Sequence, residues 1–447
     1  MFINRRSVAE SKRIIYLGLP IIIGQVLQMS MGFVDTVMAG NLSPEDLAAV
    51  AIGSSFMTPV FVFSMGLLMA MNSIISQNLG SGKILEIGRN FRQAVYLSQI
   101  MAWISFFVVR NLEWMMVYLG IEQQVVDLAQ GYIEAMSWGL PAITLYMVFR
   151  FFNEGISITR PTMYFAFVGL LFNILGNYTL MFGNFGFPAL GAVGTGWASS
   201  IVAFAMLIGI AIYTLSRKAY EKYQLLSDFR KPDFEYMKEI ITIGTPIGIS
   251  TFMEVSMFAT VALLMGKMGT AIVAGHQIAI NITALIFMIP LGLSNAITVR
   301  VGQARGRGDW EGVKRSGFAG IGITVGIMLV TATMLITIPE FLVGIYTDDS
   351  NVQSIAVSLL AMAAIFQISD GLQVSGAGAL RGLKDTKIPM IVNFTAYWLI
   401  GIPAGYAFGL WLDYGPQGLW VGLICGLTVA AILHNARFVW FLKKHAQ

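Results

Sequence analysis

The sequence predicts an all-α polytopic membrane protein with twelve transmembrane helices in two pseudo-symmetric six-helix bundles. Composition is the first observation behind this prediction. Of 447 residues, 56% are hydrophobic and only 12% are charged, and the mean hydropathy is +0.72. A soluble domain carries about 25% charged residues. The second observation is a series of long apolar segments, and the third is an internal repeat.

The apolar segments are long enough to cross a bilayer, since a spanning helix needs roughly 20 mostly apolar residues. We expect no cleaved signal peptide, because a full-length apolar span directly follows the basic N-terminal segment. The twelve expected spans are 14–38, 48–75, 93–117, 128–152, 163–186, 190–215, 239–264, 274–300, 317–343, 353–379, 388–411 and 416–442.

Residues 11–89 and 237–315 repeat one pattern 226 positions apart. The matched pairs include Gly18 and Gly244, Pro20 and Pro246, Gly40 and Gly266, and Gly66 and Gly292. Six spans per half give both halves the same orientation, related by a pseudo-twofold axis along the membrane normal. We therefore predict an N-terminal lobe at 1–215, a cytoplasmic linker at 216–238 and a C-terminal lobe at 239–447.

Lysine and arginine gather in the even-numbered loops and at both termini, whereas the odd-numbered loops hold only Arg110 and Lys267. The positive-inside rule then places both termini and every even loop in the cytoplasm. The net charge of +4 comes from the basic residues of these loops and termini, so no nucleic-acid partner is expected. The basic residues of the linker are Arg217, Lys218, Lys222, Arg230, Lys231 and Lys238.

Three carboxylates inside the expected spans are the best candidates for function: Asp35, Glu254 and Asp370. An ionisable group at the bilayer centre costs about 2.5–3.5 kcal/mol on insertion scales, so it normally has a function or a partner. No Lys or Arg lies within one helical turn of any of them, which argues against a local ion pair. The alternative is a protonated, hydrogen-bonded and inert carboxyl group. By contrast, we expect Asn153 and Glu154, with Arg150 nearby, to form an interfacial network and not a site.

The repeat relates two of these acids to other residues. Glu254 matches Gln28, and Asp35 matches Val261, so each half has one acid on its first helix, at different levels. Gln28 and Asp35 are seven residues apart and share a helix face. The acidity of the two halves is therefore asymmetric, whereas a symmetric channel would more naturally repeat its charges.

Two asparagines in the fifth span share one face, because Asn173 and Asn177 are four residues apart. Buried amides in a membrane need partners, and a polar cluster with Asp35 would supply them. Thr195, at the start of the sixth span, could join this cluster. The alternative is that these side chains only hold helices together.

Pro20 and Pro246 each lie about two turns into their expected helix, where proline removes one backbone hydrogen bond and bends the helix. Both a fixed kink and a hinge that moves with the charge of the site are consistent with this position.

Several classes of protein are excluded by missing motifs. The sequence has no P-loop, GxSxG, HExxH or CxxC motif, and its histidines lack metal-ligand spacing. An ATP-driven pump would need a partner ATPase. An intramembrane enzyme would need paired aspartates, Ser–Lys or His–metal groups inside the spans, and none is evident. We therefore expect a protein that is not an enzyme.

A set of motifs identifies the chain as similar to a known family. LGLPIIIGQVLQMSMGFVDTVMAG opens the first span, QNLGSGK and GQARGRGD follow the second and eighth, and TRPTM and LKDTKIPM open the fifth and eleventh. In this combination, over residues 8–443, the chain resembles the multidrug and toxic compound extrusion (MATE) transporters, specifically the bacterial NorM-type branch.

The resemblance implies a V-shaped fold of two six-helix lobes in the bacterial cytoplasmic (inner) membrane. It implies a secondary active antiporter that exports lipophilic, mostly cationic drugs in exchange for Na+ or H+, with no cofactor besides the coupling ion. The N-lobe acid of the family maps onto Asp35 with Asn173 and Asn177 as amide partners, and the C-lobe acids map onto Glu254 and Asp370, a possible Na+ site. We expect a monomer whose partners are small cationic drugs and membrane lipid.

One position departs from the family pattern. An aromatic residue expected one turn before Asp370 is Phe366 here and not tyrosine, so no phenol oxygen is expected there as an ion ligand. The leading alternative function is a lipid-linked precursor flippase of the same superfamily. Such flippases tend to have a cationic cavity, whereas the spans here carry acids and almost no Lys or Arg. We expect the substrate cavity between the halves, walled by Met, Phe and other aromatic residues.

The predicted topology can be tested by cysteine labelling in a Cys425→Ser background. A cysteine placed in loop 345–352 should react with an impermeant reagent from outside the cell, and one placed at 222–230 should not. Reactivity in the opposite sense would overturn the orientation.

Overall fold

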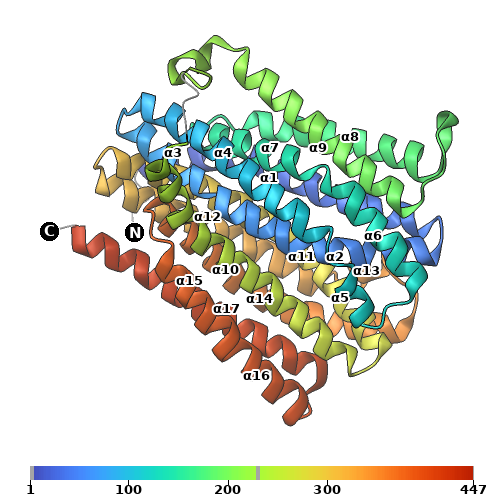
Figure 1. Ribbon diagram of the computed structural model, residues 1–447. Coiled ribbons are helices and arrows are strands. Elements are labelled where there is room, and N and C mark those ends of the chain that lie inside the picture. The colour runs from blue at the N-terminus through green and yellow to red at the C-terminus, as the bar shows by residue number, and fades with distance from the viewer. Residues whose placement is uncertain (1–4, 228–231, 446–447) are drawn as a thin grey trace. The chain divides into compact units, whose positions relative to one another are not determined.

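The computed structural model describes residues 5–227 and 232–445, and these residues form helices and connecting turns with no strand (Figure 1). Arg230 and Lys231 of the predicted basic linker lie outside the described residues. The helices of the N-terminal half are α1 (Arg5–Gly40), α2 (Pro44–Leu68), α3 (Ala70–Gly80), α4 (Ile84–Val109), α5 (Glu113–Tyr118), α6 (Gln123–Ser137), α7 (Leu140–Gly155), α8 (Arg160–Gly176), η1 (Asn177–Met181), η2 (Asn184–Gly186), α9 (Ala192–Leu215) and η3 (Lys218–Tyr223). Those of the C-terminal half are α10 (Phe234–Gly266), α11 (Thr270–Gly306), α12 (Trp310–Thr337), α13 (Pro339–Gly344), α14 (Ser350–Gly382), α15 (Lys387–Phe394), η4 (Thr395–Gly401), α16 (Ile402–Tyr406), η5 (Ala407–Trp411) and α17 (Gly415–His445).

The predicted all-helical membrane fold is confirmed. Within the described residues, ten helices are long and apolar enough to cross a membrane, and the bent pair α6 and α7, with an angle of 47° at its break, provides an eleventh. The remaining predicted span corresponds to α4, whose first turns carry Glu86, Arg89 and Arg92. Each of the twelve predicted spans therefore has a helix, or a run of consecutive helices, in the structure.

The third and ninth spans begin and end earlier than predicted. Helix α4 covers 84–109 instead of 93–117, and α12 covers 310–337 instead of 317–343. A separate short helix follows each of them, and Pro339 at the first position of α13 explains the second break, because proline begins a helix more easily than it continues one. The apolar pattern ran across both breaks, which is why the sequence did not reveal them.

The repeat is more extensive in the structure than in the sequence. Helices α2, α4 and α5 begin at Pro44, Ile84 and Glu113, and their counterparts α11, α12 and α13 each begin 226 positions later. The sequence pattern ends at 89 and 315. The helix boundaries keep the same register beyond it, so the two halves share one architecture.

The described chain divides into two compact units whose boundaries fall inside helices and not at the linker. Unit 1 comprises residues 1–22 and 249–447, and unit 2 comprises residues 23–248. Helix α1 therefore contributes its first part to unit 1 and the rest to unit 2, and α10 does the reverse. The two crossing points are again 226 positions apart. The predicted lobes at 1–215 and 239–447, joined by a linker at 216–238, stay a prediction.

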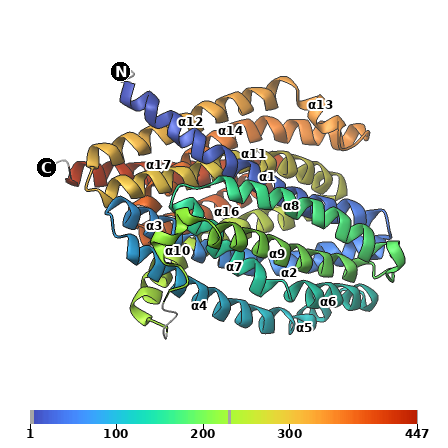
Figure 2. The ribbon, with the colours of Figure 1, turned by 90° about the horizontal axis from the view of Figure 1, so that it is seen from above.

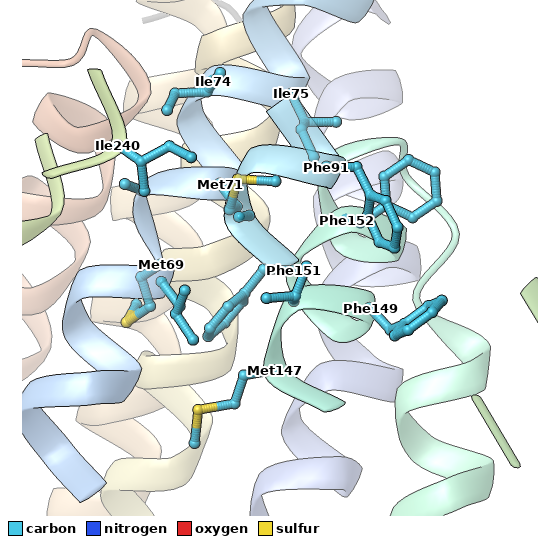
Figure 3. Close-up of a cluster of buried hydrophobic side chains, with 14 of the residues drawn as sticks. Met69, Met71, Ile74, Ile75, Phe91, Met147, Phe149, Phe151, Phe152 and Ile240 are labelled. Atoms are coloured by element: carbon cyan, nitrogen blue, oxygen red, sulfur yellow. The ribbon is translucent and has the colours of Figure 1, made fainter. Parts of the chain in front are cut away.

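The core of unit 2 shows the contribution of α10 directly. Ile240 of α10 lies beside Met69 and Met71 of the second span in the buried cluster of Figure 3. Around this cluster α4, α7 and α9 pack together, and they run side by side in Figure 2. The α10 residues up to 248 are therefore part of the hydrophobic core formed by the N-terminal half.

The predicted linker also belongs to this core. Its first part is the 3-10 helix η3, and Tyr220 and Tyr223 of η3 are buried among the hydrophobic residues of unit 2. The Tyr220 hydroxyl donates to Asn153 Oδ1 at 2.6 Å, and Asn153 Nδ2 donates to Thr214 Oγ1 at 3.0 Å. This first part of the linker therefore packs into the bundle of unit 2.

Unit 1 is built in the same way, with the start of α1 packed into the core of the C-terminal half. Ile14 and Leu17 of α1 lie in one buried cluster with Leu293 and Ile297 of α11. Helices α11, α12, α14 and α17 complete the bundle around this cluster, with α14 and α17 side by side in Figure 1. Each first helix is thus anchored at its start in the core of the other half.

The repeated glycines explain how close this packing is. A Cβ atom added at Gly66 of α2 would lie 2.6 Å from Gly248 Cα of α10, and one at Gly292 of α11 would lie 2.9 Å from the Ile22 nitrogen of α1. Glycine at these positions lets two helix backbones approach closely. The repeat preserves these glycines because both contacts depend on the absence of a side chain.

Pro20 and Pro246 lie inside continuous helices, further from the helix start than predicted. Helix α1 begins at Arg5 and α10 at Phe234, so each proline is three to four turns in, and not two, because polar turns precede the apolar segment. Each proline also lies two residues before the point where its helix passes from one unit to the other. The bend that proline allows is therefore located at the crossing.

The glycine contact predicts a large effect of a small substitution. Gly66→Ala should destabilise the protein by about 1–3 kcal/mol, because the added methyl group forces the α2 and α10 backbones apart. The measurement is thermal unfolding of the purified protein in detergent. Gly326→Ala on α12, where no atom lies within 4 Å of the added Cβ, is the matched control and should be neutral or slightly stabilising. Equal stability of both variants would contradict close packing at Gly66.

Candidate functional site

The predicted N-terminal site forms around Asp35, whose carboxylate is 8% exposed inside unit 2. Asn173 Nδ2 of α8 and Asn177 Nδ2 of η1 both donate to Asp35 Oδ1, at 2.8 and 2.6 Å. Two segments that are far apart in the sequence, α1 and the consecutive elements α8 and η1, therefore converge on one carboxylate. Because each donor is neutral, this arrangement stabilises the carboxylate without an ion pair.

Three of the residues predicted for this site each have a buried oxygen without a partner. Asn173 Oδ1, Asn177 Oδ1 and Thr195 Oγ1 are all buried, and none has a hydrogen-bond partner in the described residues. A buried polar atom without a partner costs free energy, so such atoms in a native structure need an explanation. Carboxylate, amide and hydroxyl oxygens are the ligands that hard cations prefer.

Local structure explains how the site is held. Asn177 begins η1, a π-helical turn, and such turns are frequent at functional sites because they redirect side chains. Helix α9, which carries Thr195, begins beside Asp46, whose Oδ1 accepts from Ala192 N at 2.6 Å. Ser43 caps the start of α2 by accepting from Asp46 N at 2.9 Å. The α1–α2 turn thereby positions the start of α9.

Sequence reasoning missed two neighbours of Asp35. Ser199 lies one turn after Thr195 on α9 and within hydrogen-bonding reach of the carboxylate. Tyr132 of α6 lies within direct electrostatic range of Asp35, and its hydroxyl is 3.2 Å from Ser54 Oγ. The four-residue spacing from Thr195 was a usable signal for Ser199. No local pattern marked Tyr132.

The C-terminal acids are both in unit 1, with Glu254 on α10 and Asp370 on α14. They lie within direct charge–charge range of each other, and Asp370 Oδ1 is buried without a hydrogen-bond partner. Arg381, two residues after the end of the tenth expected span, is in the last turn of α14. Its guanidinium donates to Ser294 Oγ and lies within electrostatic range of Glu254. The absence of a basic residue in the local sequence was therefore a poor guide to the environment of Glu254.

The aromatic environment of these acids also differs from the prediction. Phe366 provides no hydroxyl and packs against Phe258 and Trp420, at ring centroid distances of 5.9 and 5.5 Å. A phenol is nevertheless present, because Tyr397 of η4 lies within electrostatic range of both Glu254 and Asp370. No pattern in the sequence indicated that the eleventh span would supply this phenol.

The predicted network around Arg150 forms and is buried in unit 2. Arg150 Nε donates to Glu154 Oε1 at 2.8 Å, and Arg150 Nη1 donates to Gln28 Oε1 at 2.8 Å. Asn72 Nδ2 of α3 donates to the other Glu154 oxygen at 3.2 Å. The ion pair thus connects α7 to α1 and α3, and it neutralises Arg150 inside the bundle.

Conventional metal centres are absent from the described residues, where no three His, Cys, Asp or Glu side chains group closely enough to hold a metal ion. His276 is buried and accepts from Trp420 Nε1 at 3.3 Å, which is a packing contact. Each candidate site thus has at most two carboxylates, supplemented by neutral oxygens.

The family is established by comparison with known proteins. The MatE family profile matches residues 20–179 and again residues 246–407. The two matches begin at the two repeated prolines, 226 positions apart, so the halves are two copies of one domain. Together they cover well over half of the chain.

Solved structures agree with this assignment at the level of the fold. The eukaryotic MATE transporter AtDTX14 is 20% identical, with 98% of each chain covered and a TM-score of 0.90. An outward-facing multidrug resistance MATE family transporter of the MOP superfamily is 21% identical, covers 98% of this chain and 97% of its own, and has a TM-score of 0.88. A MOP superfamily transporter from Pyrococcus furiosus has the same identity and coverage and a TM-score of 0.87. This chain therefore belongs to the MatE family, the multidrug and toxic compound extrusion transporters.

Proposed function

We propose that this protein is a secondary active efflux antiporter of the NorM type, exporting lipophilic cations in exchange for Na+ or H+. We place it in the bacterial inner membrane with both termini in the cytoplasm, as the loop charges predict. The single observation that best supports this proposal is the buried Asp35 carboxylate with its surrounding unpartnered oxygens.

The chemistry of Asp35 suits the coupling of two cations. A proton or Na+ bound at the carboxylate neutralises its charge, and a cationic drug is attracted by the same charge when it is free. Na+ would use the oxygens of Asn173, Asn177 and Thr195 together with Asp35, whereas a proton needs the carboxylate alone. Two cations that compete for one buried charge exchange with each other, which is the requirement for antiport.

Because Asp35 lies on α1, a change in its charge can be linked to a movement of this helix. Asn173 and Asn177 hold the C-terminal part of α1 through Asp35. A change in the charge of Asp35 alters this attachment, and Pro20 lies where α1 passes to the other unit. We propose that Pro20 and its repeat partner Pro246 act as hinges at these crossings.

The C-terminal acids form a second proposed site. Glu254 and Asp370 lie within charge–charge range, so a bound cation relieves the repulsion between the two carboxylates. This acidic pair disfavours the flippase alternative, because an anionic lipid precursor would be repelled. Arg150 does not reverse this argument, since Glu154 neutralises it.

Asp35→Asn tests the coupling role of the carboxylate. The substitution keeps size and hydrogen bonding but removes the titratable charge. Drug efflux from proteoliposomes with imposed pH or Na+ gradients, each applied alone, should fall about tenfold or more, in the usual range for coupling between two sites. Asp127→Asn makes the same chemical change at an exposed position and should not affect efflux. Wild-type efflux by Asp35→Asn would refute the assignment.

Substrate charge gives an independent test. Lipophilic cations such as ethidium-like dyes should be exported and anionic dyes of similar size should not, because an anion would face Asp35, Glu254 or Asp370 in a low-dielectric environment. Counter-transport of the two dyes by the same proteoliposomes measures this difference. Equal export would show that the acids do not select the substrate and would favour the flippase function.

A further inference from the structure

Basic and acidic residues gather at opposite ends of the helices of unit 1. At one end, the segments 300–315, 381–387 and 437–445 contain eleven Lys and Arg residues and three Asp and Glu residues. The other end has one basic residue, Lys267, and four acidic ones: Glu340, Asp348, Asp349 and Asp413. The basic end therefore attracts anions, and the acidic end repels them.

Aromatic rings and basic side chains contact one another at the basic end. The Arg437 guanidinium of α17 lies 4.3 Å from the centre of the Trp440 ring and 4.8 Å from that of the Phe441 ring. The Lys444 ammonium group lies 5.2 Å from the centre of the Trp440 ring. Cation–π attraction acts at these distances, so these side chains form one continuous surface.

Two neighbouring helices extend this surface. His445, in the last turn of α17, stacks on Trp310 at the start of α12, with a ring centroid distance of 4.0 Å and an interplanar angle of 17°. Arg305, in the last turn of α11, lies 4.5 Å from the centre of the Trp310 ring. Three helix ends thus contribute to what we call the basic–aromatic patch: Arg305, Trp310, Arg437, Trp440, Lys444 and His445.

Acidic residues offset only part of the positive charge at this end. Arg437 Nε donates to Asp385 Oδ2 at 2.9 Å, in the turn between α14 and α15. Asp309 caps the start of α12, where its Oδ1 accepts from Gly312 N at 2.7 Å, and Glu311 is exposed. These are the three acids of the basic end, and its eleven basic residues leave a clear positive excess.

One face of α17 changes character toward this end. Leu433, Arg437, Trp440 and Lys444 follow one another at spacings of four, three and four residues, so they lie along one face of the helix. Leu433 and Trp440 are 40% and 45% exposed, and Lys444 is also exposed. The exposed side chains thus pass from aliphatic to aromatic to basic. A helix that leaves the hydrocarbon core through the headgroup region shows this order, because tryptophan is enriched at that level.

The corresponding helix of unit 2 is α9, and its surroundings differ. Basic residues are present there too, and the Lys222 ammonium group lies 5.0 Å from the centre of the Tyr223 ring. Tyr220 and Tyr223 are buried in the core of unit 2, whereas Trp440 is half-exposed. Positive charge at this helix end is therefore common to both units, and the exposure of its aromatic ring distinguishes the patch of unit 1.

We propose that the basic–aromatic patch binds the headgroup of an anionic phospholipid at the membrane surface. Arg437 and Lys444 donate charge-assisted hydrogen bonds to the phosphate oxygens, and Trp440 lies beside them at the level of the headgroup. The acyl chains continue along the apolar face of α17 that begins at Leu433. A lipid fits this surface better than a nucleic acid does, because a nucleic acid has no apolar part to cover that face. Such a lipid site is independent of the transported ion and drug.

Native mass spectrometry of the full-length protein in detergent tests the proposal by counting bound lipids. Phosphatidylglycerol is the anionic probe, and phosphatidylcholine with the same acyl chains is the zwitterionic control. Lys443→Gln combined with Lys444→Gln should raise the dissociation constant for phosphatidylglycerol about tenfold or more, because each basic residue near a membrane surface strengthens the binding of anionic lipid about fivefold. The binding of phosphatidylcholine should not change.

A matched variant makes the same change of charge in unit 2. Lys218→Gln combined with Lys222→Gln removes two exposed basic residues, one of which also lies over an aromatic ring. This variant should bind phosphatidylglycerol as the wild type does. Trp440→Leu keeps apolar bulk and removes the ring, and it should weaken phosphatidylglycerol binding about two- to fivefold. Thermal unfolding in detergent without added lipid should give the same midpoint for all variants.

Three results would overturn the patch as a lipid site. The first is equal affinity of the wild type for the two lipids. The second is an equal loss of phosphatidylglycerol affinity in the unit 2 variant, which would reveal attraction by net charge alone. The third is displacement of the bound lipid by excess inorganic phosphate or by an oligonucleotide, which would reveal an anion site with no preference for lipid. A loss of affinity confined to the variants of unit 1 supports the site, and either result leaves the proposed efflux function untouched.

Discussion

Helices α1 and α10 each contribute residues to both compact units, and the rest of the structure depends on this arrangement. Helix α1 leaves unit 1 after Ile22, and α10 leaves unit 2 after Gly248. Their early parts must fit against α11 and α2, which is possible only because Gly292 and Gly66 leave room for the helix backbone. The acids Asp35 and Glu254 then follow on the later parts of the same helices. Each half therefore depends on the other for a complete core, and both acids lie on the helices that connect them.

Polar groups inside the bundles fall into two kinds. In the buried network of Arg150 and Glu154, one charge offsets the other, and Gln28 and Asn72 satisfy further atoms. Two atoms of this network, Arg150 Nη2 and Asn72 Oδ1, have no hydrogen-bond partner in the described residues. At the acids and their amide neighbours the atoms without a partner are oxygens: Asn173 Oδ1, Asn177 Oδ1 and Asp370 Oδ1. The two kinds of cluster therefore differ in the type of atom that is left without a partner.

Much of this organisation could be predicted from the sequence. The apolar segments predicted the helical membrane fold, since the thickness of the bilayer sets their length, and the 226-residue repeat predicted two like halves. The convergence of Asp35 with Asn173 and Asn177 was expected from four-residue spacing. Tyr397, Tyr132 and Arg381 were not anticipated, because they reach the acids from helices that are distant in the sequence. The periodicity of a single helix does not show which other helices it will contact. The burial of the linker tyrosines was missed for the same reason.

The exchange of helix starts has a consequence for biosynthesis. When the ribosome has completed the N-terminal half, the core around Met69, Met71 and Phe152 still lacks Ile240 and its neighbours on α10. The start of α1 likewise lacks its packing partner α11, which is synthesised much later. Neither bundle can reach its final packing until the seventh and eighth spans have been inserted, so the nascent N-terminal half must persist in the membrane with an incomplete core. Tyr220 and Tyr223 precede α10 in the chain, so the part of the core that they contribute is synthesised before Ile240.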